Sequence, residues 1–190
     1  MNVPLLNHRG TVTLETDRLI LRPFKKGDEL FMFSNWSSDP DVVRYMSWPR
    51  HLSVSDSRTV VSLWLKNQKS DSWYNWAIVP KIAGHPIGSI GILNIDSRTR
   101  SGDIGYCIAQ NWWGNGMVPE AFRAVRDYMF DTVGLEKIKA KHCVENPKSG
   151  RVMQKCGMLH EGTARSELPD GDNILHDVEV YGMLRSDLRK

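Results

Sequence analysis

The stretch NWWGNGMVPEA, residues 111–121, decides the fold because it places a Gly-Asn-Gly turn directly before an amphipathic helix. The first N–H groups of a helix have no acceptor inside the helix, and together with the helix dipole they attract anions. Glycines at 114 and 116 allow backbone conformations that other residues resist, and they let a phosphate approach without meeting a Cβ atom. The stretch therefore indicates a helix entrance whose amides are left free for an external anion.

A purely structural interpretation of the same turn also stands. Two glycines between a strand and a helix often serve the turn alone, and Asn115 has a side chain of the capping type. The segments on either side of the turn are needed to choose between the two interpretations.

The elements around the turn are predicted from their periodicity. Between residues 116 and 132, apolar side chains recur at the spacing of one helical face: Met117, Ala121, Ala124, Val125, Tyr128 and Met129. A strand is predicted before the turn, over 103–109, and another after it, over 137–144, where lysines alternate with mostly apolar residues. Asn146-Pro147 gives an N-cap followed by proline at the first helical position, so a helix is predicted from there to Cys156.

The remaining elements give a mixed order. Strands are predicted over 19–24, 73–79, 86–95, 158–164 and 177–184, and helices over 26–36 and 54–68. This order is typical of a mixed α/β (α+β) single domain rather than a regularly alternating, doubly wound one. No early GxGxxG and no GxxxxGK[ST] motif occurs, which argues against dinucleotide and nucleoside-triphosphate folds.

Length and composition limit the domain count. A chain of 190 residues is long enough for one domain with a sizeable core. We expect residues 1–14 to form an N-terminal extension and residues 15–190 to form the domain. A hydrophobic content of 41% and a charged content of 25% are ordinary for a globular protein.

Compartment and ligand class follow from the N-terminus, the cysteines and the charge. The first residues lack the basic and apolar segments of a signal peptide, and no apolar run is long enough to span a bilayer. We therefore expect a cytoplasmic protein with no membrane partner. Cys107, Cys143 and Cys156 form no CxxC or Cys/His pattern, so neither a disulfide framework nor a metal site is expected. A formal charge of +3 suits an anionic ligand but is too small and scattered to predict nucleic-acid binding.

Taken together, these motifs resemble the GCN5-related N-acetyltransferase (GNAT) family. The resemblance spans about residues 15–186, and it is carried by the strand at 103–109, the turn WWGNGMVPEA, the strand at 137–144, the run ENPKSGRV at 145–152 and the run KCGM at 155–158. The opening ETDRLILRP, residues 15–23, is similar to that of the RimJ/RimL-type branch, which contains the ribosomal-protein alanine N-terminal acetyltransferases.

The resemblance implies a GNAT fold, in which a mixed central sheet of six to seven strands is flanked by about four helices. Two neighbouring parallel strands, here 103–109 and 137–144, would splay apart. Acetyl-CoA, a co-substrate, would lie in the gap with its pyrophosphate over the Gly-x-Gly helix entrance. No metal is implied.

Residues that bind acetyl-CoA follow from the same resemblance. The pyrophosphate would lie on the backbone amides of Gly114, Asn115, Gly116 and Met117. Backbone groups of Ile108 and Ala109 would hold the pantetheine arm and the acetyl group, and Asn146 would bind the pantetheine from the other wall. Arg151 is a candidate for the nucleotide end, with simple solvation of an exposed helix arginine as the alternative.

Acetyl transfer needs a neutral amine, a stabilised oxyanion and a stabilised or protonated leaving thiolate. In much of the family a tyrosine serves the leaving group, but this chain has Met153 at that position. The RimJ/RimL-type branch implies Ser149 near the sulfur and Glu167, in the loop before the last strand, as the general base. The alternatives are that Ser149 bonds to the helix backbone and that Glu167 simply faces water. Tyr106 and Asp103, both on the strand at 103–109, are lesser candidates for handling the proton, with a place in the core as the alternative for Tyr106.

The acceptor is the part of the reaction that the sequence defines least. In this family the segment between the first two helices helps to wall the acceptor site, so Tyr45 and Trp48 are expected to contact the substrate. The predicted function is direct transfer of an acetyl group from acetyl-CoA to a primary amine, with a protein N-terminal α-amine as the first choice. A small amine (a polyamine, amino acid or antibiotic) and a CoA-binding module without catalysis stay open, as does a homodimer.

Overall fold

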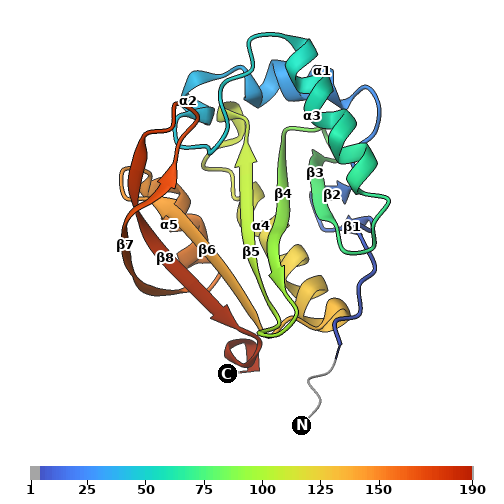
Figure 1. Ribbon diagram of the computed structural model, residues 1–190. Helices are drawn as coiled ribbons and strands as arrows, with labels where there is room; N and C mark the ends of the chain where they lie inside the picture. Colours follow the sequence, from blue (N-terminus) through green and yellow to red (C-terminus); the bar gives the residue numbers. More distant parts are fainter. Residues whose placement is uncertain (1–4, 190) are drawn as a thin grey trace.

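The computed structural model describes residues 5–189, which are organised around one eight-stranded sheet (Figure 1). In spatial order the strands are β1 (Leu14–Glu15), β2 (Leu19–Arg22), β3 (Tyr74–Pro80), β4 (Gly88–Asp96), β5 (Ser101–Ile108), β6 (Lys137–Cys143), β8 (Leu175–Leu184) and β7 (Leu159–Pro169). Every neighbouring pair is antiparallel except β5 and β6, which run parallel.

Strands β5 and β6 are paired only where they begin. The pairs are Ser101 with Lys137, Gly102 with Ile138, and Asp103 with Lys139, after which this pairing ends. Beyond that point β5 stays paired with β4, while β6 stays paired with β8. The two strands therefore diverge (Figure 1), and a gap opens in the middle of the sheet. This confirms the expected splayed pair.

Alternation along the strands gives the sheet two buried faces. In β3, Tyr74, Trp76 and Ile78 belong to the core formed with α4 (Met117–Asp127) and α5 (Pro147–Lys155). The residues that alternate with them, Ala77 and Val79, belong to the core formed with α1 (Asp28–Met32) and α3 (Val54–Asn67). Successive side chains of a strand point to opposite faces, so one strand can serve both cores.

Helices α2 and α3 begin at recognisable capping residues. Helix α3 has a capping box between Ser53 and Asp56. The short α2 (Pro40–Val43) begins at Asp39, whose side chain accepts a hydrogen bond from an amide of the first turn. Helices α1 and α4 each continue into a π-helical turn, at Phe33–Ser37 and Tyr128–Val133. Two short 3-10 helices complete the elements, at Gln110–Trp112 and Arg185–Arg189.

Residues 5–13 lie against the rest of the molecule without forming a helix or a strand. The Asn7 amide donates to the carbonyl of Val133, and the Gly10 amide donates to the carbonyl of Asp71. The boundary predicted at residue 15 stays a prediction.

The predicted fold class is confirmed, and three details differ. The sheet has an eighth strand, because Leu14–Glu15 pairs with β2, and the short α2 was not predicted. Glu167 was predicted in a loop, but it lies within β7. Between Ala164 and Leu168 the pairing of β7 with β8 shifts register, and Ser166 has a φ of 49° there. This bulge interrupts the alternation by which a strand is recognised in a sequence.

Candidate active site

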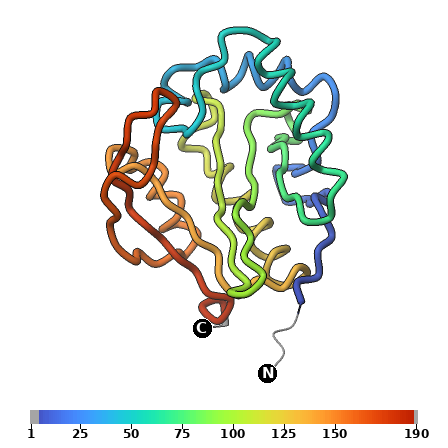
Figure 2. The backbone as a smooth tube through the Cα atoms, viewed as in Figure 1, coloured from blue at the N-terminus to red at the C-terminus, as the bar shows by residue number. Residues whose placement is uncertain are grey.

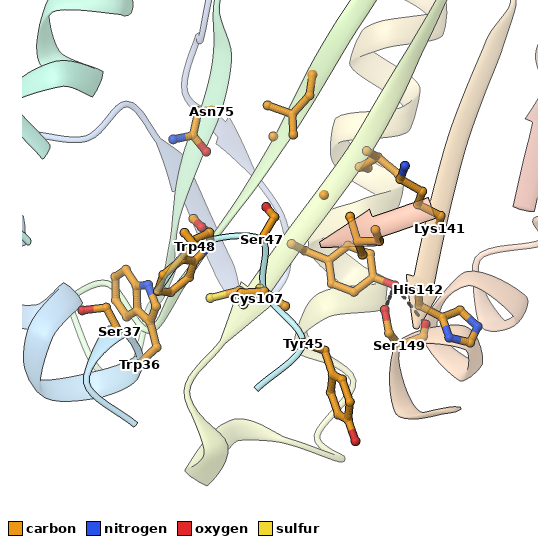
Figure 3. Close-up of a pocket in the computed structure, with 18 of the residues that line it drawn as sticks. Trp36, Ser37, Tyr45, Ser47, Trp48, Asn75, Cys107, Lys141, His142 and Ser149 are labelled. Atoms are coloured by element: carbon orange, nitrogen blue, oxygen red, sulfur yellow. Dashed lines mark hydrogen bonds between the residues drawn. The ribbon is translucent and has the colours of Figure 1, made fainter. Parts of the chain in front are cut away.

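Two cavities meet at the gap between β5 and β6. The first, here called the α4 cavity, has a volume of about 860 Å³ and is lined by the entrance of α4, the first turns of α5 and the segment around α2. The second, here called the aromatic cavity, has a volume of about 420 Å³ and lies among tryptophans on the side of α3 (Figure 3). Residues that line both cavities are Tyr45, Met46, Tyr106, Cys107, Asn146 and Ser149.

The entrance of α4 is uncapped, as its sequence predicts. Gly116 is the N-cap residue, and no side chain accepts a hydrogen bond from the first turn. Gly114 and Gly116 have φ values of 77° and 74°, a region that favours glycine. Within residues 5–189, the amides of Gly114, Asn115, Gly116 and Met117 donate to no protein acceptor. These N–H groups form a ready site for an anion.

Arg18 holds the turn in place. Its Nη1 donates to the carbonyl of Asn115 at 3.0 Å, and its Nε donates to Glu120 Oε2 at 2.6 Å. The Asn115 side chain does not cap α4 but donates to the carbonyl of Trp113 at 3.4 Å. Because Glu120 lies in the first turn of α4, Arg18 ties the turn and the helix to the sheet edge.

Helix α5 adds positive charge to the α4 cavity. Lys148, Arg151 and Lys155 all line this cavity, at spacings that bring them onto one side of the helix. In the described part of the chain, none of the three forms an ion pair. Lys148 Nζ lies 4.4 Å from the centre of the Trp113 ring. A cavity with unpaired cations attracts an anionic ligand.

The groups predicted to hold the pantetheine arm differ in whether they line the cavity and in whether their polar atoms already have hydrogen-bond partners. Ile108 and Asn146 line the α4 cavity, whereas Ala109 does not. The Ala109 amide donates to the Ile87 carbonyl at 2.8 Å, and the Ile108 carbonyl accepts from the Trp113 indole at 2.9 Å. Asn146 caps α5 through its Oδ1, which accepts from the Ser149 amide at 3.4 Å.

Ser149 and Tyr106 meet across the gap. Ser149 Oγ donates to the Tyr106 hydroxyl at 3.1 Å, and that hydroxyl donates to the Ser149 carbonyl at 2.9 Å. The Ser149 end of these bonds is visible in Figure 3. Burial raises the pKa of Tyr106 above its ordinary value of 10.0, so the phenol keeps its proton at neutral pH. Met153, where a tyrosine was expected in the family, is buried in the core.

Glu167 lies beside the aromatic cavity but outside both linings. Its Oε1 is 3.2 Å from Lys141 Nζ, and its side chain is half-exposed. Lys141 and Leu168 do line the aromatic cavity. Ser149, Asn146 and Tyr45 thus line both cavities together. Glu167 lines neither cavity, but it forms an ion pair with Lys141, which lines the aromatic cavity.

The tip of the β7–β8 hairpin contacts the loop at Trp48 and Pro49, beside the aromatic cavity. At Gly171, a Cβ atom would lie 2.7 Å from the Trp48 carbonyl oxygen, so hairpin and loop are in contact. The His176 ring lies 6.1 Å from the Tyr45 ring, and its Nε2 is 3.0 Å from Asp170 Oδ2. Figure 2 shows the red tip of the hairpin beside the segment that contains α2. Tyr45 and Trp48, the predicted substrate contacts, thus lie where this segment meets the hairpin.

Two absences among the described residues concern membranes and metals. No helix between residues 5 and 189 is long and apolar enough to cross a bilayer. In the same range, no three His, Cys, Asp or Glu side chains cluster as a metal site would require.

A family model described as an acetyltransferase (GNAT) domain matches residues 18–159, which is more than half of the chain. An uncharacterized N-acetyltransferase, p20 of Bacillus licheniformis, is 30% identical over 91% of this chain and 96% of its own length. The crystal structure of a GNAT-family acetyltransferase from Bacillus anthracis has a TM-score of 0.80 and 26% identity, and the match covers 92% of this chain and 99% of that one.

Two relatives with named acceptors match more weakly. The [ribosomal protein uS5]-alanine N-acetyltransferase of Escherichia coli is 32% identical over 42% of this chain and 43% of its own length. The spermidine N(1)-acetyltransferase of Vibrio cholerae is 23% identical over 76% of this chain and 81% of its own length.

Proposed function

The chain belongs to the GNAT acetyltransferase family and is an acetyl-CoA-dependent N-acetyltransferase, and we propose that its acceptor is the α-amine of a polypeptide N-terminus. The observation that carries this proposal is the continuity of the two cavities at the gap between β5 and β6. One cavity presents free amides and unpaired cations, the other is aromatic, and both reach Tyr45, Asn146 and Ser149.

The α4 cavity fits acetyl-CoA in its hydrogen-bond donors and its charge. The free amides of residues 114–117 suit a diphosphate, and Arg151, with the other cations of α5, suits the phosphate at the nucleotide end. Asn146 and the backbone of Ile108 would bind the pantetheine arm, while Ala109, whose amide is already bonded, would contribute packing. When bound, acetyl-CoA supplies an activated acetyl group and a thiolate leaving group.

Ser149 and Tyr106 would serve the leaving group. Ser149 can turn its hydroxyl hydrogen from Tyr106 toward a departing sulfur, and Tyr106 can then donate to Ser149 Oγ. The raised pKa of Tyr106 suits a hydrogen-bond donor that stays protonated. In this proposal the pair stabilises the charge that grows on the sulfur in the transition state.

Glu167 would take the proton of the acceptor amine. Its half-exposed carboxylate can pass a proton to water, and its ion pair with Lys141 holds it beside the aromatic cavity. In the described chain no carboxylate lines that cavity, so the only base proposed stands at its rim.

This arrangement favours an α-amine over a lysine or polyamine nitrogen. The ordinary pKa of an α-amine is about 8, whereas that of a lysine amine is about 10.4. At neutral pH a far larger fraction of an α-amine is therefore neutral. A base beside the aromatic cavity, such as Glu167, is then sufficient to accept the proton that the amine loses during transfer. The sequence similarity to the uS5-alanine N-acetyltransferase agrees with this choice, while similarity to the spermidine enzyme supports a small amine as the second candidate.

The test uses one peptide that contains an internal lysine, with its N-terminus either free or blocked. Each form is incubated with the protein and acetyl-CoA, and both the thiol released and the peptide mass are measured. The proposal predicts one acetyl group on the free peptide, located on the α-amine, and none on the blocked peptide. Acetylation of the lysine, or of small amines alone, would contradict it.

A further inference from the structure

The aromatic cavity contains no acidic side chain. Its lining within residues 5–189 includes one lysine, Lys141, and no aspartate or glutamate. The two histidines of the lining are both buried, and burial lowers the pKa of His51 below its ordinary value of 6.5. The nearby carboxylate of Glu167 is outside the lining and paired with Lys141, so a positive charge that entered this cavity would meet no carboxylate in its walls.

The walls of this cavity are large and mostly apolar. Tryptophan, methionine and aliphatic side chains make up much of the lining: Met32, Trp36, Trp48, Trp64, Trp73, Leu93 and Ile104. Apart from Lys141 and the two histidines, the polar side chains of the lining are uncharged, and those labelled in Figure 3 include Ser37, Ser47 and Asn75. A volume of about 420 Å³ is within the range of roughly 300–1,000 Å³ found for small-molecule sites, and it far exceeds what a methyl group fills.

Desolvation in such a cavity acts on the acceptor nitrogen. An ammonium that loses water and gains no carboxylate has a lowered pKa, so entry favours the neutral amine that attacks. The same effect works against an acceptor with several ammonium groups, because each further charge would be buried unpaired. The walls of the cavity thus favour an acceptor that has a single amine and no other charged group.

We propose that the aromatic cavity selects an acceptor whose amine is attached to a bulky, apolar and uncharged body. For a polypeptide N-terminus this means a first residue with a large apolar side chain, such as leucine or phenylalanine, rather than alanine. The inference rests on the proposed function, since it assigns the aromatic cavity to the acceptor. The side chain would occupy the aromatic cavity, which Trp48 and Trp64 help to line, with the nitrogen directed toward Ser149, where the two cavities meet.

An acceptor panel tests this selectivity. Peptides that differ only in a first residue of alanine, leucine, phenylalanine or glutamate are compared with 2-phenylethylamine and spermidine by thiol release. We expect kcat/KM for the leucine or phenylalanine peptide to exceed that for the alanine peptide about tenfold or more. Spermidine should fall below 2-phenylethylamine by about a hundredfold, because it carries extra charge into the cavity.

The outcomes separate this inference from the proposed function. If the alanine peptide or spermidine is the best acceptor, the selectivity inference is overturned, while transfer to an amine stands. If no peptide reacts but 2-phenylethylamine is favoured over spermidine, the selectivity stands and the polypeptide acceptor fails. If no acceptor in the panel releases thiol, both proposals fail.

Substitutions at Gly105 test the cavity itself. Gly105 lines the aromatic cavity but not the α4 cavity, and a Cβ atom there would meet only Leu93, at 3.8 Å. A Cβ atom therefore fits at this position, and we expect Gly105→Leu to reduce the free volume of the cavity, with Gly105→Ala as an intermediate step. The ratio of kcat/KM for the phenylalanine and alanine peptides should fall about tenfold in Gly105→Leu. A ratio that stays constant while acetyl-CoA binding is retained would overturn the proposal.

A gain of function at Asn75 tests the charge argument. Asn75 lines the same cavity, and Asn75→Asp adds a carboxylate with almost no change of shape. The variant should use spermidine about tenfold better relative to 2-phenylethylamine, because the extra ammonium gains a partner. No change in that ratio, in a variant whose acetyl-CoA affinity is normal, would contradict the role assigned to the missing carboxylates.

Discussion

Ser149 on α5 and Tyr106 on β5 are hydrogen-bonded to each other across the gap in the sheet, with their hydroxyl oxygens 3.1 Å apart. Both residues line both cavities. Because β5 and β6 are paired only from Ser101 to Asp103, the hydroxyl pair lies beyond the pairing, where the two cavities meet. In the proposed reaction this pair serves the leaving thiolate.

Removal of either hydroxyl should therefore lower kcat and leave the affinity for acetyl-CoA almost unchanged. We expect about a tenfold to hundredfold loss for Ser149→Ala and for Tyr106→Phe, since each removes a donor that acts on developing charge. The double variant should lose little more kcat than the less active of the two single variants, because the two hydroxyls act as a unit. Losses that multiply would show that the two residues act independently.

Glu167→Gln should lower turnover most at low pH, where little of the acceptor amine is neutral. Glu161→Gln is the matched control: Glu161 lies on the same strand and pairs with Lys137 at 2.6 Å, but it lines neither cavity. The measurement is kcat/KM for the acceptor between pH 6 and pH 9. Equal pH profiles for the two variants would remove Glu167 as the base.

Gly116→Val should weaken acetyl-CoA binding by about tenfold or more, because a branched side chain at a positive φ distorts the turn and shields its amides. Gly84→Val provides a matched control. Gly84 also has a positive φ, of 70°, and it lies outside both cavities with open space around it. Both variants should lose about 1–2 kcal/mol of stability from backbone strain. If calorimetry gives equal affinities for the two, the phosphate site is elsewhere.

Alkaline pH should destabilise the fold through its buried thiols. Burial raises the pKa of Cys107 to about 12 and that of Cys156 to about 11, from an ordinary value of 9.0. Above pH 9 the folded protein holds these protons longer than the unfolded chain does, so this stability is complete below pH 9 and is lost as the pH rises toward 12. Each thiol contributes a slope of about 1.4 kcal/mol per pH unit.

Urea unfolding at pH 8 to 10 checks this slope. In Cys156→Ala the fall of stability with pH should be shallower than in the parent protein by the contribution of one proton. If the unfolding free energies of the variant and the parent protein fall in parallel with pH, Cys156 does not contribute to the loss of stability.

The sequence predicts the fold well because its main elements carry strong local signals. The alternating lysines of β6 and the Asn146-Pro147 start of α5 both occur where they were predicted. The same kind of signal, Asp39-Pro40, starts α2 and could have predicted it. β1 has only two residues, and no periodicity can be read from so short a strand.

The site was less predictable because its geometry depends on long-range contacts. Tyr106 and Ser149 are 43 residues apart, and their contact follows from where β5 and β6 separate. Arg18 reaches the glycine turn from 97 residues away. Glu167 could be assigned to a role only through the family resemblance, and its place beside Lys141 depends on a bulge in β7 that no local pattern announces.

The central claim is that the free amides at the entrance of α4 hold the diphosphate of acetyl-CoA, and backbone amide NMR tests it most directly. On addition of acetyl-CoA to ¹⁵N-labelled protein, the amides of Gly114, Asn115, Gly116 and Met117 should show the largest shifts, while that of Gly84 stays constant. Saturable binding that leaves these four amides unshifted would contradict the account.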